Sequence, residues 1–237
     1  MYTYLLINLG SILGPFFLSF DKKVAFYKSW GPLFGGIGIA GGAFIIWDIF
    51  FTEWGIWSFN PKYLSGISAF GLPLGEWLFF LTIPYACVFI YACMNAYVKK
   101  DYLGAHAKTI NRVLALVLLV MGIIFWDRMY TAVTFILTGI YLLLHSEVWK
   151  SPWMGRFYMG YMVSLVPFLI VNGMLTAFPV VQYNDLENLA TRIYTIPVED
   201  TMYMLLLLLL TTHFFEIFKA RQLAKKEKEA PLQKSYA

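Results

Sequence analysis

The segment Pro73-Leu74-Gly75-Glu76 recurs 124 positions later as Pro197-Val198-Glu199-Asp200, and the same shift lays the chain over itself without a gap. It also pairs Asp48 with Asn172, a near-isosteric amide. A repeat of this length predicts two similar halves, and pseudo-symmetric membrane proteins place their site between such halves. The polar residues that recur in both halves are therefore the first candidates for function.

The composition indicates an integral membrane protein. Hydrophobic residues make up 59% of the 237 residues and charged residues 14%, whereas soluble domains are roughly 45–50% apolar. Apolar runs long enough to cross the hydrocarbon core of a bilayer occupy residues 2–20, 31–52, 77–98, 110–127, 129–148, 157–178 and 200–218. We therefore expect an all-α membrane protein with seven transmembrane helices.

The repeat predicts how these helices are organised. Residues 1–218 are expected to form one transmembrane domain, with a first half at 1–98, a linker helix at 110–127 and a second half at 129–218. The linker helix gives both halves the same orientation, so the repeat is parallel. Residues 219–237 are rich in Lys and Glu and are expected to be a solvated tail. The first apolar run has no basic stretch before it and no small-residue cleavage site, which favours a retained helix over a signal peptide.

The distribution of Lys and Arg predicts the orientation in the membrane. Basic residues gather after the first, third and fifth helices, at 22–28, 99–112 and 150–156, and again in the tail. By the positive-inside rule these segments are cytoplasmic, and the N-terminus lies outside. The net charge of +4 thus reflects orientation. No basic patch is interleaved with aromatic residues, so nucleic acid is not an expected partner.

The two outer loops, residues 54–72 and 178–196, are rich in aromatic residues and predict structured caps near the membrane surface. Trp54, Trp57, Tyr63 and Tyr183 have two interpretations. They fit the aromatic belt that membrane proteins carry at the bilayer interface. They also fit the lining of a site for a long apolar ligand.

Carboxyl groups within apolar segments are costly to bury, which makes each one a functional hypothesis. Asp48 lies inside the second segment, while Glu76, Glu199 and Asp200 follow prolines at the start of the third and seventh. Acidic residues in a first helical turn also stabilise free backbone N–H groups, but their placement in both halves favours function. Asn172 is interpreted as an inward polar group or as an interhelical hydrogen-bond donor.

Several kinds of chemistry lack the residues they need. His213 has no second His or Cys at metal-ligand spacing, no Ser, Cys and His arrangement indicates a nucleophile and base, and no glycine-rich phosphate motif precedes a helix. We expect neither a metal nor a soluble cofactor. Cys87 and Cys93 lie six positions apart in one apolar run, so a disulfide framework is not expected.

The motifs resemble those of a known family, the small integral-membrane lycopene cyclases of bacteria, which occur as two subunits or as one fused chain. The resemblance covers nearly the whole chain and rests on Trp47-Asp48, Gly55-Ile56-Trp57-Ser58-Phe59-Asn60-Pro61, Pro73 to Tyr85, Val171-Asn172-Gly173 and Ile196 to Asp200. The family carries Pro-x-Glu-Glu or Pro-x-Glu-Asp in each half. This chain looks like the fused form, but it has Gly75 where the first motif carries Glu, and Ala92 stands opposite Glu216 in the repeat.

The resemblance implies a reaction and a location. A linear end group of lycopene or a related carotenoid would become a β-ionone ring without redox change, in the cytoplasmic membrane of a bacterium. Membrane lipid and other enzymes of carotenoid biosynthesis would be its neighbours. An acid must protonate the terminal alkene and a base must remove a ring proton. Burial in apolar surroundings favours the neutral, proton-carrying form of an acid.

The resemblance also suggests residue roles. Glu199 is the candidate proton donor, Asp200 and Glu76 are candidate partners or bases, and Asp48 and Asn172 complete the catalytic set. Aromatic faces attract cations, and aromatic residues lie beside the acidic motifs. The candidate substrate-binding residues are Trp47, Trp77, Phe79, Phe80, Tyr203 and the recurring pair Asn60 and Asn184.

Other classes remain or are disfavoured on specific residues. A carotenoid-binding or transport protein could use the same cavity without chemistry, and Gly75 leaves that alternative open. A retinal photoreceptor would need a lysine in the seventh helix, and residues 205–218 contain none. A prenyltransferase would need Asp-rich helical motifs for magnesium, which Asn184-Asp185-Leu186-Glu187 only weakly imitates. If the family resemblance holds, Gly75 is either a natural divergence or a substitution that impairs activity.

Overall fold

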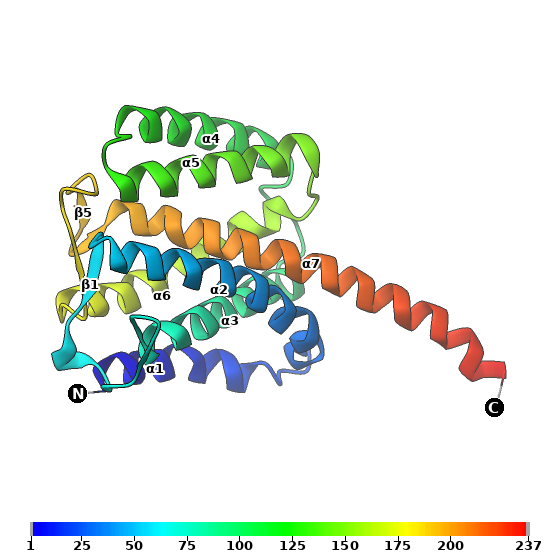
Figure 1. The fold of residues 1–237 in the computed structure, drawn as a ribbon. Helices are drawn as coiled ribbons and strands as arrows, with labels where there is room; N and C mark the ends of the chain where they lie inside the picture. Colours follow the sequence, from blue (N-terminus) through cyan, green and yellow to red (C-terminus); the bar gives the residue numbers. More distant parts are fainter. Residues whose placement is uncertain (1, 236–237) are drawn as a thin grey trace.

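The computed structural model describes residues 2–235, in which seven α-helices lie side by side in one bundle (Figure 1). They are α1 Thr3–Leu18, α2 Trp30–Glu53, α3 Leu74–Tyr97, α4 Ala107–Ile124, α5 Met129–Leu143, α6 Met154–Ala177 and α7 Val198–Ser235. A π-helical turn, Leu144–Val148, continues α5. The expected all-α membrane architecture is confirmed. Six helices are long and apolar enough to cross a membrane, while α1 has 16 residues, about 24 Å at 1.5 Å per residue.

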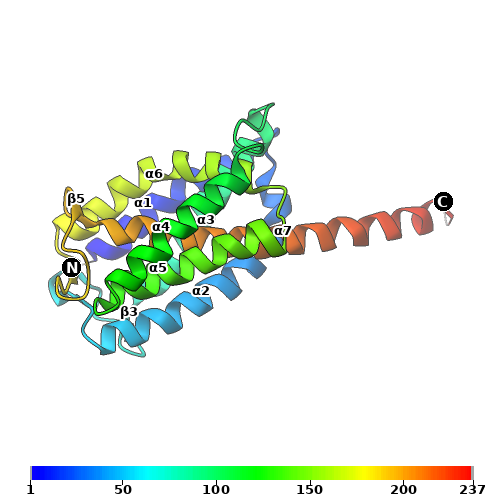
Figure 2. The same cartoon turned by 90° about the horizontal axis from the view of Figure 1, so that it is seen from above.

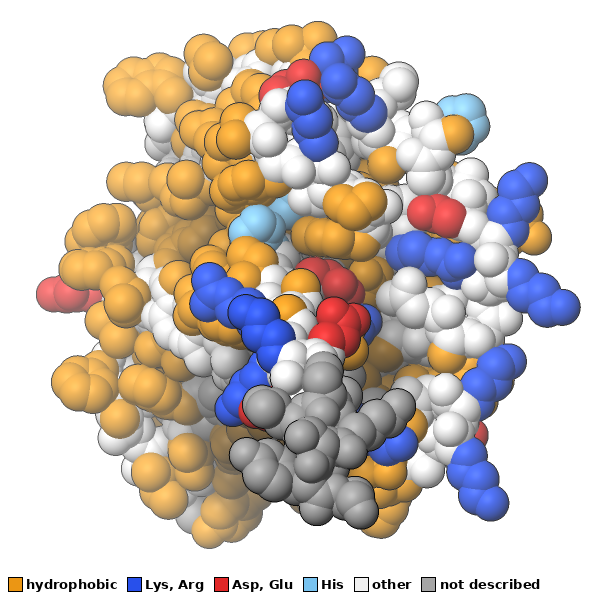
Figure 3. Space-filling model, turned by 90° about the vertical axis from the view of Figure 1, so that its right-hand side faces the viewer, with side chains coloured by type: hydrophobic (Ala, Val, Ile, Leu, Met, Phe, Trp, Pro, Cys, Tyr) orange, Lys and Arg blue, Asp and Glu red, His pale blue; other side chains and the backbone are white. Residues whose placement is uncertain are grey.

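The surface of the bundle is suited to lipid. Large apolar side chains are exposed on its flanks, for example Leu116 at 65%, Ile123 at 64% and Val166 at 63%. Figure 3 views the end at which α7 leaves the bundle; Lys and Arg side chains lie at this end, and hydrophobic side chains cover the flank. An apolar flank of this extent would be unfavourable in water, so the chain is an integral membrane protein.

The helix ends follow the predicted apolar segments closely. Residues 125–128 alone connect α4 to α5, a turn as short as the sequence predicts. The difference lies at the other end of the chain, where α7 continues as one helix to Ser235 and extends beyond the bundle (Figures 1 and 2). The charged segment that the sequence analysis treats as a tail is thus helical over residues 219–235.

Short strands and hairpins cover one end of the bundle. β1 Trp57–Phe59 pairs antiparallel with β4 Val181–Tyr183, while β2 Ser68–Ala69 pairs with β3 Leu72–Pro73 and β5 Arg192–Ile193 with β6 Ile196–Pro197. Phe70 and Gly71 between β2 and β3 both have positive φ, as a two-residue type I′ turn requires. Each hairpin leads directly into a helix, so β3 and β6 fix where α3 and α7 begin.

The bounds of several elements differ by the repeat length of 124. This holds at both ends of α2 and α6, of β1 and β4, of β2 and β5, and of β3 and β6. Hydrogen bonds follow the same offset: the backbone N–H of Asn60 donates to Val180 O and that of Asn184 donates to Ile56 O, both at 2.9 Å. In the β1–β4 pair, Ser58 lies opposite Gln182, its own counterpart at this offset.

Helix α7 occupies the middle of the bundle, between α2 and α6 in the view from above (Figure 2). Glycine allows α2 to lie directly against it. A Cβ added at Gly36 would lie 2.8 Å from the carbonyl oxygen of Thr211 and 3.1 Å from Phe215 N. No side chain fits between the two backbones at this crossing.

We therefore expect Gly36→Ala to destabilise the protein by about 1–3 kcal/mol through overpacking. Gly38, two residues along the same helix, has no atom within 4 Å of an added Cβ. Gly38→Ala is the matched control and should be neutral or stabilising by up to about 1 kcal/mol, because alanine favours helix. Thermal unfolding of both variants in detergent measures the difference, and equal stability of the two would refute the close crossing.

Candidate active site

Three buried carboxyl groups line one small cavity. Asp48 from α2, Glu76 from α3 and Asp200 from α7 are exposed by only 2%, 7% and 4%, and Asn172 from α6 lies with them. The cavity has a volume of about 60 Å³. Because Glu76 and Asp200 occupy the first turns after β3 and β6, the hairpins set their positions. The structure thus brings together four of the five candidate catalytic residues.

Asp200 is the best-satisfied carboxylate of the three. Tyr130 Oη donates to its Oδ1 at 2.6 Å, while Asn172 Nδ2 and Tyr183 Oη donate to its Oδ2 at 2.6 and 2.8 Å. Burial raises the pKa of the Tyr183 hydroxyl well above its usual value, and the charge of Asp200 adds to the effect. The hydroxyl therefore keeps its proton and remains a donor. Three donors stabilise a carboxylate in an otherwise apolar place.

Glu76 is held by a residue from the first helix. Tyr4 Oη donates a hydrogen bond to Glu76 Oε2, and the aromatic ring of Tyr4 lies directly against Gly75. Asn8 in the same helix donates to the carbonyl oxygen of Gly75 at 2.9 Å. Tyr4 thus fills the space that a side chain at position 75 would need, which gives a structural reason for Gly75 in the first acidic motif.

Asp48 differs from both. Its Oδ2 is buried and has no hydrogen-bond partner among the described residues. An ionised carboxylate without a donor is costly to bury in an apolar environment. Glu76 lines the same cavity. Asp48 is thus the carboxyl group of the cavity with the fewest hydrogen-bond donors around it.

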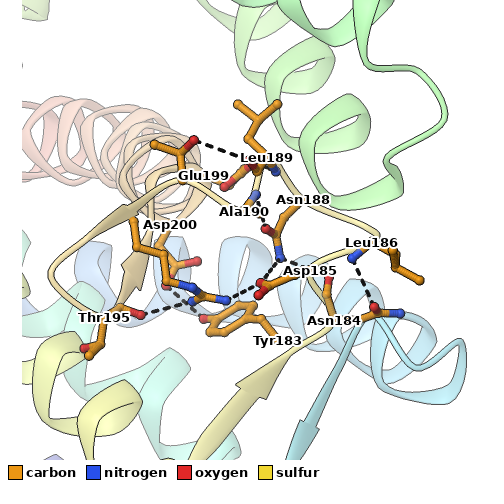
Figure 4. Close-up of polar contacts among 12 residues, drawn as sticks. Tyr183, Asn184, Asp185, Leu186, Asn188, Leu189, Ala190, Thr195, Glu199 and Asp200 are labelled. Atoms are coloured by element: carbon orange, nitrogen blue, oxygen red, sulfur yellow. Dashed lines mark hydrogen bonds and ion pairs between the residues drawn. The ribbon is translucent and has the colours of Figure 1, made fainter.

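Glu199, the candidate proton donor of the sequence analysis, faces elsewhere. Its Oε1 accepts from Thr131 Oγ1 at 2.6 Å and from the backbone N–H of Leu189 at 2.8 Å. Its Oε2 is buried and has no hydrogen-bond partner among the described residues. Neighbouring residues of a helix point about 100° apart, and the two side chains face different neighbours here. Figure 4 shows Glu199 bonded to Leu189 and Asp200 turned to Tyr183. Glu199 ties α7 to α5 and to the loop before β5, and it does not line the cavity.

The candidate substrate-binding residues divide into three groups. Phe79 and Tyr203 line the cavity, while Trp47 and Phe80 pack one layer behind, both against Phe44. The remaining three make hydrogen bonds within the loops that cover this end of the bundle. Trp77 Nε1 donates to Ala69 O at 3.2 Å. The side chains of Asn60 and Asn184 accept from the backbone N–H groups of Lys62 and Leu186, both at 3.1 Å.

The structure adds aromatic residues that the acidic motifs do not indicate. Trp57 packs edge-on against Tyr130 with 5.2 Å between ring centroids, and Tyr130 stacks on Tyr183 at 5.9 Å. All three line the cavity with Tyr4. Trp57 and Tyr183 thus favour the ligand-lining interpretation over the aromatic belt. Tyr4 and Tyr130 lie far from the motifs in sequence, and no local pattern marks them.

The sequence model of the family described as lycopene cyclase matches residues 1–94 and 127–218. The chain belongs to the lycopene cyclase family. The two matched regions contain every residue of the carboxyl cavity and leave out α4. Searches of curated proteins and of solved structures found no match.

Membership in the lycopene cyclase family fits a carotenoid cyclase with a linear carotenoid substrate in a lipid environment. Carboxyl groups from α2, α3 and α7 line the cavity beside aromatic rings. Within residues 2–235 no group of three or more His, Cys, Asp or Glu side chains has the arrangement of a metal site.

Proposed function

We propose that this protein is a lycopene β-cyclase that converts linear carotenoid end groups into β-ionone rings by a proton-initiated reaction without redox change. One observation carries the proposal: three buried carboxyl groups with unequal hydrogen bonding share a cavity lined by aromatic rings. Pairs of acids whose surroundings favour opposite protonation states are typical of acid–base sites.

The reaction balances with one proton added and one removed. A carboxylic acid protonates the terminal double bond, which leaves a tertiary carbocation. The next double bond attacks that cation, so that the ring bond forms and the positive charge moves to a ring carbon. A base then takes a proton from the neighbouring ring carbon, which restores a double bond inside the ring. The product has the same formula as the substrate.

We assign the proton-donor role to Asp48 and the base role to Asp200. Asp48 lines the cavity and its Oδ2 has no hydrogen-bond partner among the described residues, which suits a carboxyl group that holds a proton and delivers it to an alkene. Asp200 receives three hydrogen bonds, which suits a carboxylate. These roles replace the assignment of Glu199 as donor.

Aromatic rings support the cationic steps. Trp57, Tyr130 and Tyr203 lie around the carboxyl groups, with 5.2 to 6.2 Å between their ring centroids. Each aromatic face attracts a cation by roughly 0.5–2 kcal/mol. An alkene is a weak base, so stabilising the cation matters as much as the strength of the acid. The position of Asp200 relative to the ring carbon decides which proton leaves and hence the ring type, which we propose to be β.

We further propose that the protein is a parallel repeat of two three-helix halves, joined by α4. The shared offset of 124 in element bounds and backbone hydrogen bonds supports this arrangement. So does the antiparallel pairing of β1 with its own counterpart β4, which a twofold axis between the halves would produce. We also propose that the N-terminus lies outside and the C-terminus in the cytoplasm, in the cytoplasmic membrane of a bacterium; the distribution of basic segments supports this orientation.

Glu199 provides a test of the assigned roles. Glu199→Gln keeps an oxygen that can accept from Thr131 and Leu189, so ring formation should stay within about threefold of the wild type, whereas loss of a proton donor costs roughly 10²–10⁴-fold. Glu199→Ala removes both contacts and should lower stability by about 1–3 kcal/mol. Conversion rate and thermal unfolding in detergent measure the two effects. A loss of 100-fold or more in well-folded Glu199→Gln would return the donor role to Glu199.

The proposed function itself is tested in cells that accumulate lycopene. Pigments are separated by chromatography and identified by absorption spectrum and exact mass, with cells carrying an empty vector as the control. We expect new pigments with β-ring spectra and the mass of lycopene. Lycopene left unchanged by well-expressed protein would overturn the proposal. If the protein then carries bound lycopene through purification, the carotenoid-binding alternative takes its place.

A further inference from the structure

A large apolar groove adjoins the carboxyl cavity. It has a volume of about 540 Å³ and lies between α1, α3 and α6. Four residues line both spaces, namely Phe79, Ile83, Phe168 and Asn172. Along α1 the lining extends from Thr3 to Pro15, about 18 Å at 1.5 Å per residue. The groove is therefore a long apolar extension of the small site that contains the acids.

The groove opens to the lipid side of the bundle. Its floor is buried, with Ile83 and Cys87 each 8% exposed, while its rim is open, with Leu6 at 65% and Ile170 at 59%. Gly10 lies along the groove, and an added Cβ there would meet no atom within 4 Å. A lipophilic chain lying in the bilayer could therefore reach the groove sideways, without passing through water.

The corresponding place in the other half of the chain is closed. Thr134 and Thr211, which lie 124 positions after Gly10 and Cys87, are both fully buried. Two packing differences account for this. Helix α4 covers α5, whereas within residues 2–235 no helix covers the outer side of α1 (Figure 1). The Gly36 crossing also brings α2 directly against α7. The apolar groove thus adjoins the cavity on the side of α1, and in residues 2–235 the equivalent positions on the other side are filled by packed helices.

We propose that this groove binds the extended polyene chain of one linear carotenoid, with the end group of that molecule in the carboxyl cavity. The proposal rests on the proposed function and adds the location of the chain and its path of access. Its consequence is that one end group is processed at a time. A substrate with two linear ends must leave the groove and return in the reverse direction before its second ring can form.

The test uses protein purified from lycopene-accumulating cells, with total carotenoid per protein measured by absorbance and ring content by chromatography. Gly10→Phe narrows the groove from α1, and Ala86→Phe narrows it from α3. Gly38→Phe is the matched control, because Gly38 is an open glycine on α2 outside the groove. We expect both groove variants to retain about tenfold less carotenoid than the wild type and the control, corresponding to ~1.4 kcal/mol of lost binding.

The outcomes separate the groove from the proposed function. If the groove variants retain less carotenoid and the wild type makes no rings, the result supports the proposed binding groove and refutes the proposed cyclase function. If all four proteins make rings equally and retain equal amounts of carotenoid, the result refutes the proposed binding groove and is consistent with the proposed cyclase function. A wild type that retains only membrane lipid also refutes the groove. Should Gly10→Phe fail to fold, as judged by gel filtration, Ala86→Phe decides between these outcomes.

Discussion

Replacing Asp48 by Asn should lower ring formation by at least about 100-fold, the minimum expected for loss of a general acid. The amide matches the carboxyl group in size, so packing at this 2%-exposed position is preserved. It has no acidic proton to deliver to an alkene. The amount of cyclic pigment formed per unit of protein in lycopene-accumulating membranes measures the effect.

The control is Asp127→Asn, which removes a carboxyl group from the exposed α4–α5 turn and should leave ring formation unchanged. Both variants are compared at equal protein level and with their thermal unfolding recorded. Asp48→Asn that folds normally and keeps more than about a tenth of wild-type activity would exclude Asp48 as the proton donor.

Introducing the acid that the first motif lacks should disrupt the protein. In Gly75→Glu the new Cβ would lie 2.9 Å from Tyr4 Cβ and closer still to the ring. Overpacking of this kind costs about 1–3 kcal/mol and sometimes more. The displaced Tyr4 would also lose its hydrogen bond to Glu76. We therefore expect a lower unfolding temperature and reduced ring formation.

A double variant identifies the cause. Tyr4→Ala removes the ring against which position 75 packs, so Gly75→Glu should cost much less in a Tyr4→Ala background than in the wild type. A coupling of about 1–3 kcal/mol in this cycle is expected for residues in direct contact. If Gly75→Glu alone raises both stability and activity, the Tyr4 ring does not block a glutamate side chain at position 75. Gly75 would then be a substitution that impairs the protein.

The positions of the helices and the identity of the buried acids can be predicted from the sequence. Long apolar runs predict helix positions because the bilayer demands such runs, and the repeated Pro motifs predict where α3 and α7 begin. Asp48, Glu76, Asn172 and Asp200 are likewise found from polarity in apolar segments, since a buried polar group needs a reason. The structure brings these four together in one cavity.

Side-chain direction and long-range partners could not be predicted in the same way. Glu199 and Asp200 are adjacent in sequence, and only the packing of α7 shows that Asp200 faces the cavity while Glu199 faces Thr131 and Leu189. Tyr4 reaches Glu76 across 72 positions, a contact that no local pattern contains. The apolar groove depends on which helices cover α1 and α5, which composition does not specify.

Isotope incorporation tests whether the cyclisation starts with a proton that a buried acid gives to the substrate. Membranes containing the wild-type protein in excess over lycopene are equilibrated in D₂O, and the cyclic product of a single turnover is analysed by mass spectrometry. Because the acid exchanges its proton with the solvent, we expect one non-exchangeable deuterium in the product for each ring formed. A cyclic product with the same mass as that made in H₂O would contradict this expectation.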